Sequence, residues 1–233
     1  MKKKHLGILS TTKAFLLAIS LTFLFPVYSA SVKDAQQREE IVCKENVAIG
    51  PNDVYAGKDR AGCKTSLYHG QFESYATLDK MYKTLPDDDD MRDMGIGRNS
   101  NQRVDEEKRD VTIRHAFLYA YKYEKAGDHD YHLIIGTTKE GILFTAECSG
   151  LPVSSSEDYQ ALLDVRKKFR CFIDQTPGEK NRSWNFYDPP IPIEISGSLF
   201  FDIDHAPGAV GPQGHRPETS WEIHPISNIK FFK

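Results

Sequence analysis

The sequence predicts a mainly β fold of the α+β class, and three observations support this prediction. Runs rich in β-branched and aromatic residues recur through the C-terminal two thirds of the chain. One longer run has the apolar spacing of an amphipathic helix. Turn-forming Gly, Pro and Asp separate these runs. We therefore predict a β domain over residues 106–233, preceded by an N-terminal extension over residues 31–105.

The extension lacks clean periodicity, and only one of its segments has a helical pattern. Residues 75–85 (YATLDKMYKTL) carry apolar side chains at helical spacing and predict a short helix that ends before Pro86. Four consecutive aspartates at 87–90 predict a solvated, mutually repelling loop.

The β domain begins with three strands, predicted over residues 111–123, 131–136 and 141–148. Residues 158–173 form the strongest helical pattern, with a serine cap at 154–156. Strands over 191–204 and 220–232 complete the order β-β-β-α-β-β, and the prolines at 189, 190 and 192 confine the fourth strand's entry to an edge or a strand start. This order predicts an OB-like barrel of five strands with a helix between the third and fourth, while another α+β arrangement has the same order.

Residues 1–30 have the pattern of a secretory signal peptide. A lysine-rich start precedes an apolar run of twelve residues at 14–25. The small residues that follow would allow cleavage after Ser29, Ala30 or Ser31. The apolar run is too short for a transmembrane helix, and no later run is apolar enough to span a membrane. We expect an exported protein of the periplasm or the extracellular space.

The charge of the mature chain disfavours non-specific nucleic-acid binding. The full chain has 30 basic and 33 acidic residues, and the first thirty residues hold four lysines and no acid, so cleavage takes the net charge from −3 to −7. An acidic surface repels a polyanion. The ligand and the oligomeric state stay open.

Four cysteines fall in the mature chain and predict disulfide bonds in an exported protein. Of the three possible pairings, Cys43–Cys63 and Cys148–Cys171 close the shortest loops and are the expected pairs. A zinc site built from these cysteines is disfavoured because the chain has no C-x-x-C spacing.

Polar side chains alternate with apolar ones on three predicted strands. Residues i and i+2 share a face of a strand, so converging strands would gather the polar members on one face: Asp130, His132, Asp202, Asp204, Glu222 and His224. Carboxylates and imidazoles suit a divalent metal such as Zn or Mn, with Glu147 or His205 as general base. A solvated sheet face gives the same alternation.

Three motifs in order resemble a family of exported bacterial β-rich proteins of unknown function. They are D-x-D-Y-H-L at 128–133, G-S-L-F-F-D-x-D-H at 197–205 and W-E-x-H-P at 221–225, within a match over roughly 75–231. The resemblance implies export, a β-rich domain and a shared polar site, but no reaction. The matching candidate ligand residues are Asp128, Asp130, His132, Glu147, Asp202, Asp204, His205, Trp221, Glu222 and His224.

The preferred functional hypothesis is an exported β-barrel that binds an unknown ligand such as a sugar, an envelope component or a host molecule. Tyrosines at 119, 121 and 123 would share one strand face, and the favoured interpretation is that they cover the core; the alternative is a face of aromatic rings that binds sugars or bases. The alternative is a phosphodiesterase or nuclease-like hydrolase that depends on a divalent metal. A purely structural envelope protein is a third possibility.

Overall fold

The computed structural model describes residues 38–43, 47–138 and 140–233 of the chain. Arg38–Lys233 forms one compact unit. The predicted signal peptide lies outside the described residues. Within those residues, no helix is both long enough and apolar enough to cross a membrane.

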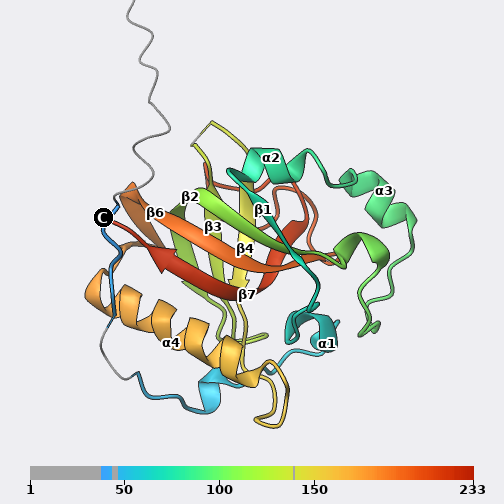
Figure 1. Cartoon of the computed structure of the whole chain (residues 1–233), viewed down its shortest axis with the longest axis horizontal. Helices are drawn as coiled ribbons and strands as arrows, with labels where there is room; N and C mark the ends of the chain where they lie inside the picture. Colours follow the sequence, from blue (N-terminus) through green and yellow to red (C-terminus); the bar gives the residue numbers. More distant parts are fainter. Residues whose placement is uncertain (1–37, 44–46, 139) are drawn as a thin grey trace, which may run out of the picture. The chain divides into compact units, whose positions relative to one another are not determined.

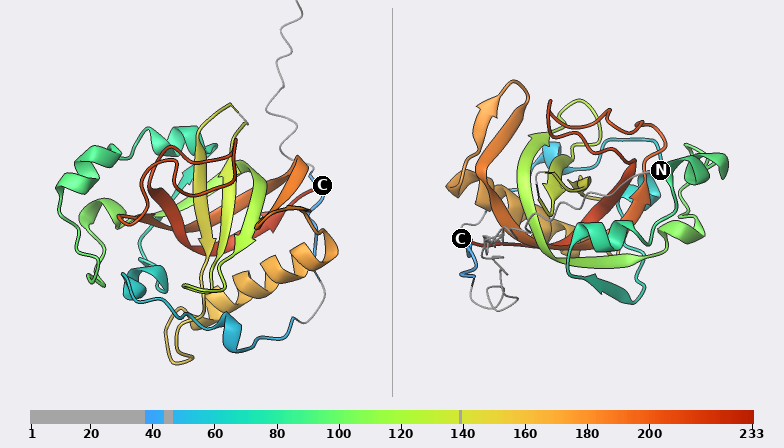
Figure 2. Two further views of the ribbon diagram at one scale, coloured as in Figure 1. Left: turned by 180° about the vertical axis from the view of Figure 1, so that it is seen from behind. Right: turned by 90° about the horizontal axis from the view of Figure 1, so that it is seen from above.

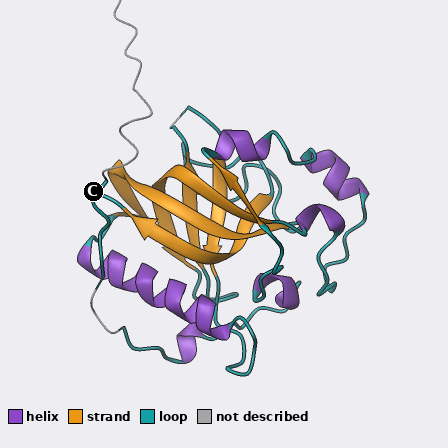
Figure 3. Cartoon of the chain, viewed as in Figure 1, coloured by secondary structure: helices purple, strands orange, loops and turns teal. Residues whose placement is uncertain are grey.

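Five strands close into a barrel at the centre of this unit (Figures 1 and 3). They are β2 (Asp110–Tyr123), β3 (Tyr131–Gly136), β4 (Leu143–Cys148), β6 (Trp184–Phe201) and β7 (Trp221–Phe231). Hydrogen bonding runs β2-β3-β4-β7-β6 and returns to β2, with β4 parallel to β7 and the other pairs antiparallel. The helix α4 (Tyr159–Gln175) separates the third and fourth barrel strands. The predicted OB-like barrel is confirmed.

Helices on opposite sides of the barrel contribute to its apolar core. On one side α4 buries Val165, Phe169 and Phe172 in the same cluster as the inward side chains of the strands. On the other side lie α2 (Leu78–Tyr82) and α3 (Asp88–Asp93), as Figures 1 and 2 show. These two helices add Leu78, Met81 and Met91 to the core.

Short elements complete the chain and extend the sheet. β1 (Phe72–Tyr75) pairs in parallel with β2, and β5 (Glu179–Asn181) pairs with β6. Among the described residues, the remaining elements are α1 (Ala61–Lys64) and the 3-10 turns η2 (Pro51–Asp53) and η3 (Asp105–Glu107).

Two local predictions in the extension are wrong. Residues 72–75 form β1, so the helix expected over 75–85 shrinks to the five residues of α2. The aspartate run forms α3 rather than a loop, because its Met91 is buried in the core and Asp88 accepts hydrogen bonds from Thr219 Oγ1 and Ser220 N, both at 2.6 Å.

The fourth barrel strand begins earlier than the prolines suggested. β6 starts at Trp184, and its pairing with β2 breaks between Ile191↔Leu118 and Phe186↔Ala120. Pro189 and Pro190 lie inside this break, where the ladder needs no hydrogen bond from them. The prolines therefore interrupt the strand's pairing without marking its start.

The predicted disulfide pairs are wrong. Cys43 is bonded to Cys171 on α4, while Cys63 and Cys148 are buried thiols. The observed bond spans 128 positions of sequence, so loop length was no guide to it.

Candidate functional site

A polar pocket of about 500 Å³ lies against the outer face of β3 and β4. It is bordered by the β2–β3 loop, the β6–β7 loop and part of the N-terminal extension. In OB-folds, the second and third strands with the loops joining strands 1–2 and 4–5 form the usual ligand-binding surface. The pocket lies at that place, and its volume suits a small ligand.

Strand alternation explains why polar side chains reach this outer face. Leu133 and Ala146 belong to the barrel core, so their neighbours His132 and Glu147 point outward. These two residues are register partners, and His132 Nδ1 lies 3.1 Å from Glu147 Oε1.

Each lysine or arginine that lines the described part of the pocket is paired with a carboxylate. Lys64 Nζ lies 2.8 Å from Asp128 Oδ2, and Lys122 Nζ lies 2.5 Å from Glu124 Oε2. Arg98 pairs with Asp204. The wall therefore presents charged groups of both signs that can donate or accept hydrogen bonds, with no concentration of positive charge.

A His–Asp pair forms the side of the pocket that belongs to the β6–β7 loop. His205 Nδ1 lies 2.5 Å from Asp202 Oδ2, and Asp202 Oδ1 accepts a hydrogen bond from Asp204 N at 2.8 Å. Burial works to raise the pKa of Asp202, but these partners and Lys64 outweigh it and hold this pKa at about 2. The hydrogen bond between His205 and Asp202 also raises the pKa of His205.

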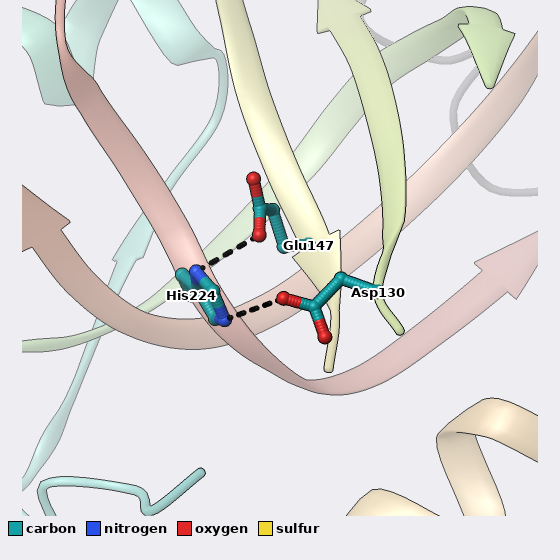
Figure 4. A group of neighbouring side chains, drawn as sticks. All are labelled: Asp130, Glu147 and His224. Carbon is teal, nitrogen blue, oxygen red and sulfur yellow. Dashed lines mark ion pairs between the residues drawn. The ribbon is translucent and has the colours of Figure 1, made fainter. Parts of the chain in front are cut away.

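Behind the pocket wall, β4, β7 and the residue just before β3 bring a His and three carboxylates together. Figure 4 shows Asp130 and Glu147 pointing toward different ring nitrogens of His224. Asp130 Oδ2 lies 3.6 Å from His224 Nε2, while Glu147 Oε2 and Glu222 Oε2 lie 3.1 and 3.5 Å from His224 Nδ1. All four residues are buried, and Glu147 also borders the pocket.

Burial dominates the electrostatics of this cluster. It raises the pKa of Glu147 to about 7, although the Lys64 ammonium opposes the shift. It raises the pKa values of Asp130 and Glu222 well above their usual range and lowers the pKa of His224 well below its own. Low dielectric favours the uncharged form of each group.

The structure separates the predicted site residues into three places. Those at the pocket are Asp128, His132, Glu147, Asp202, Asp204 and His205. Asp130, Glu222 and His224 lie in the buried cluster with Glu147. Trp221 lies inside the barrel against Phe201, with its Nε1 donating to Pro86 O at 3.0 Å.

The expected tyrosine face does not form. A bulge in β2 between Leu118 and Ala120 shifts the register, so Tyr121 packs in the main core and Tyr119 in a separate cluster. The aromatic side chain that lines the pocket is Trp184, which the sequence patterns did not single out. Lys64 was missed too, because the segment around α1 has no periodicity that predicts its place.

The fold and the pocket define a small OB-like barrel domain with a polar pocket on the face that carries the ligand in other OB-folds. Comparison with family models, with curated proteins and with solved structures finds no match to this chain.

Proposed function

We propose that the protein is an exported binding module whose pocket takes a neutral saccharide. The main support is that Lys64, Arg98 and Lys122 are each paired with a carboxylate. An anionic ligand such as a nucleic acid would need unpaired cations in the pocket. A neutral ligand with many hydroxyl groups instead needs many hydrogen-bond donors and acceptors, and this wall offers both.

Trp184 supports the saccharide class. Its partly buried ring borders the pocket at the start of β6. An aromatic ring at a polar pocket gives the apolar face of a sugar a surface to stack on, and OB-folds bind oligosaccharides at this location. Export is supported by the signal-peptide pattern and by the Cys43–Cys171 bond. The family resemblance found in the sequence stays a prediction.

The test is isothermal titration of the purified protein with neutral trisaccharides, namely maltotriose, cellotriose and chitotriose, and with heparin and a dodecathymidylate as polyanions. We expect at least one trisaccharide to bind, with Trp184→Ala weakening the affinity about tenfold and the exposed Phe72→Ala on β1 leaving it unchanged. Binding of the polyanions alone would contradict the proposal, as would equal affinity of the Trp184→Ala variant.

The hydrolase alternative has narrower support than the sequence suggested. It needs metal ligands that converge, yet Asp204 pairs with Arg98 and Asp202 with His205. Among the described residues, the group that fits around an ion is Asp130, Glu147 and His224. That group raises a question about metal binding that is independent of saccharide binding.

A further inference from the structure

The buried cluster has the ligand types and spacing of a metal site. One ligand atom each from Asp130, Glu147 and His224 lies within 4.8 Å of the others. Two ligands bonded to one ion at about 2.0–2.2 Å are separated by roughly 3–4 Å. Asp130 Oδ2 lies 3.6 Å from His224 Nε2 and Glu147 Oε2 lies 3.1 Å from His224 Nδ1, so each ring nitrogen has one carboxylate at a distance in that range.

Buried polar atoms in the cluster lack hydrogen bonds. In the described structure, Asp130 Oδ2, Glu222 Oε2 and both ring nitrogens of His224 make none of normal geometry. Asp130 and His224 are fully buried. A buried polar atom without a hydrogen bond costs about 1–3 kcal/mol, more for a charged group, so native proteins rarely leave several together.

The cluster also has an excess of acid. Asp130, Glu147 and Glu222 surround one imidazole, and the Lys64 ammonium is committed to Asp128 at 2.8 Å. Arg103 donates to main-chain oxygens, including His224 O at 3.1 Å. A divalent cation supplies the charge that buried carboxylates lack and the coordination that His224 lacks.

We propose that Asp130, Glu147 and His224 bind one divalent transition-metal ion. His224 Nε2 faces Asp130, and Nδ1 faces the Glu147 and Glu222 carboxylates, so the ring nitrogen that does not bind the ion still has a carboxylate to accept its N–H. A metal-bound His normally donates its other N–H to a carboxylate in this way, which fixes the orientation of the ring. Glu147 borders the pocket, so the ion has a path of entry.

The donor set selects the ion. One imidazole with two carboxylates suits Mn²⁺ or Zn²⁺, whereas an imidazole is a poor ligand for Ca²⁺ or Mg²⁺. Three protein ligands leave one position of a tetrahedral zinc site for water.

The test uses the purified protein, first analysed for bound metal and then stripped with EDTA and titrated with MnCl2 or ZnCl2 alone. We expect one ion per chain, with a rise in melting temperature for the ion that binds. Asp130→Asn and Glu147→Gln should each weaken ion affinity at least tenfold. Glu194→Gln, which removes a carboxylate paired with Lys230 elsewhere on the barrel, should leave it unchanged.

Wild-type protein that binds neither ion at millimolar concentration overturns the proposal. So does zinc binding that both cluster variants retain, because exposed histidines then hold the ion. Far-UV circular dichroism identifies a variant that does not fold, and the wild-type stoichiometry then decides alone. Saccharide titrations enter none of these measurements, so the saccharide proposal can fail while the metal site stands, or the reverse.

Discussion

At the scale of single residues, a buried arginine joins the N-terminal extension to the barrel. Arg60 is 1% exposed, and both of its terminal nitrogens donate to Glu107 at 2.7 Å. Glu107 in turn accepts from Phe201 N at 2.9 Å, next to the site of the His–Asp pair. This network fixes the end of β6 from which the pocket loop departs.

Arg60→Met should lower the free energy of unfolding by about 3–5 kcal/mol, because it leaves the Glu107 carboxylate buried and unpaired. Urea denaturation measures the loss. The double variant Arg60→Met/Glu107→Leu should recover a large part of it, and Lys108→Ala on the surface should change little. A loss below about 1 kcal/mol for the single variant would show that the pair is not essential.

The His205–Asp202 pair predicts a pH-dependent contribution to stability. The raised pKa of His205 means that its stabilisation is present below the unfolded value near 6.5 and is lost as pH rises through the folded value. His205→Gln should therefore destabilise the protein more at pH 5.5 than at pH 8.5. Thermal melts at the two pH values measure this difference.

The matched control for that comparison is Glu124→Gln. The ion pair with Lys122 lowers the pKa of Glu124, so this carboxylate is charged in the folded and the unfolded protein at both pH values. Glu124→Gln should therefore reduce stability by the same amount at pH 5.5 and at pH 8.5. A His205→Gln effect that is equal at both pH values, or larger at pH 8.5, would contradict the assigned pair.

On β3 and β7, sequence alternation predicted which side chains face outward but not what they meet. Alternation separated Glu222 and His224 from Trp221 and Ile223 correctly. It gave no pairing register between strands, so it could not tell that Glu147 completes the cluster while Asp204 lies at Arg98.

At the scale of elements, α4 closes one side of the barrel through aromatic packing. Phe172 stacks on Phe231 of β7 with ring centroids 3.8 Å apart, and both rings are buried. Phe172→Ala should cost about 3–5 kcal/mol of unfolding free energy, because the rigid sheet cannot collapse into the cavity. Chemical denaturation measures it, with the exposed Val153→Ala as control. A loss similar to that control would contradict this packing.

The disulfide between Cys43 and Cys171 ties the start of the described chain to α4. Peptide mapping without reduction should find these two cysteines linked and the buried Cys63 and Cys148 alkylated only after unfolding. The double variant Cys43→Ser/Cys171→Ser should lose about 2–5 kcal/mol, since the bond restricts a long loop in the unfolded chain. A Cys43–Cys63 peptide would contradict the structure.

The sequence predicted the barrel strands better than the extension for a physical reason. Barrel strands have one core face and one outer face, so their apolar residues alternate visibly. The extension instead makes single anchors, such as Met91 and Arg60, whose partners are distant in sequence. Local patterns carry no signal for such contacts, and the long-range disulfide escaped prediction for the same reason.

At the scale of the whole molecule, the order of the strands in the barrel determines where the pocket lies. The chain connects β2 to β3 and β6 to β7 at the same end of the outer β3–β4 face, so both loops border one cavity. The N-terminal extension adds Lys64 and Asp59 as a third wall. An OB-like barrel with these loops and this extension therefore builds a pocket from segments far apart in sequence.

The most direct test of the saccharide proposal uses the two tryptophans as reporters. Trp184 borders the pocket and Trp221 lies in the core. When the trisaccharide that binds most tightly is added, we predict a saturable change in tryptophan emission that Trp221→Phe retains and Trp184→Phe abolishes. A change that survives Trp184→Phe, or no change with any of the three trisaccharides, would contradict saccharide binding in this pocket.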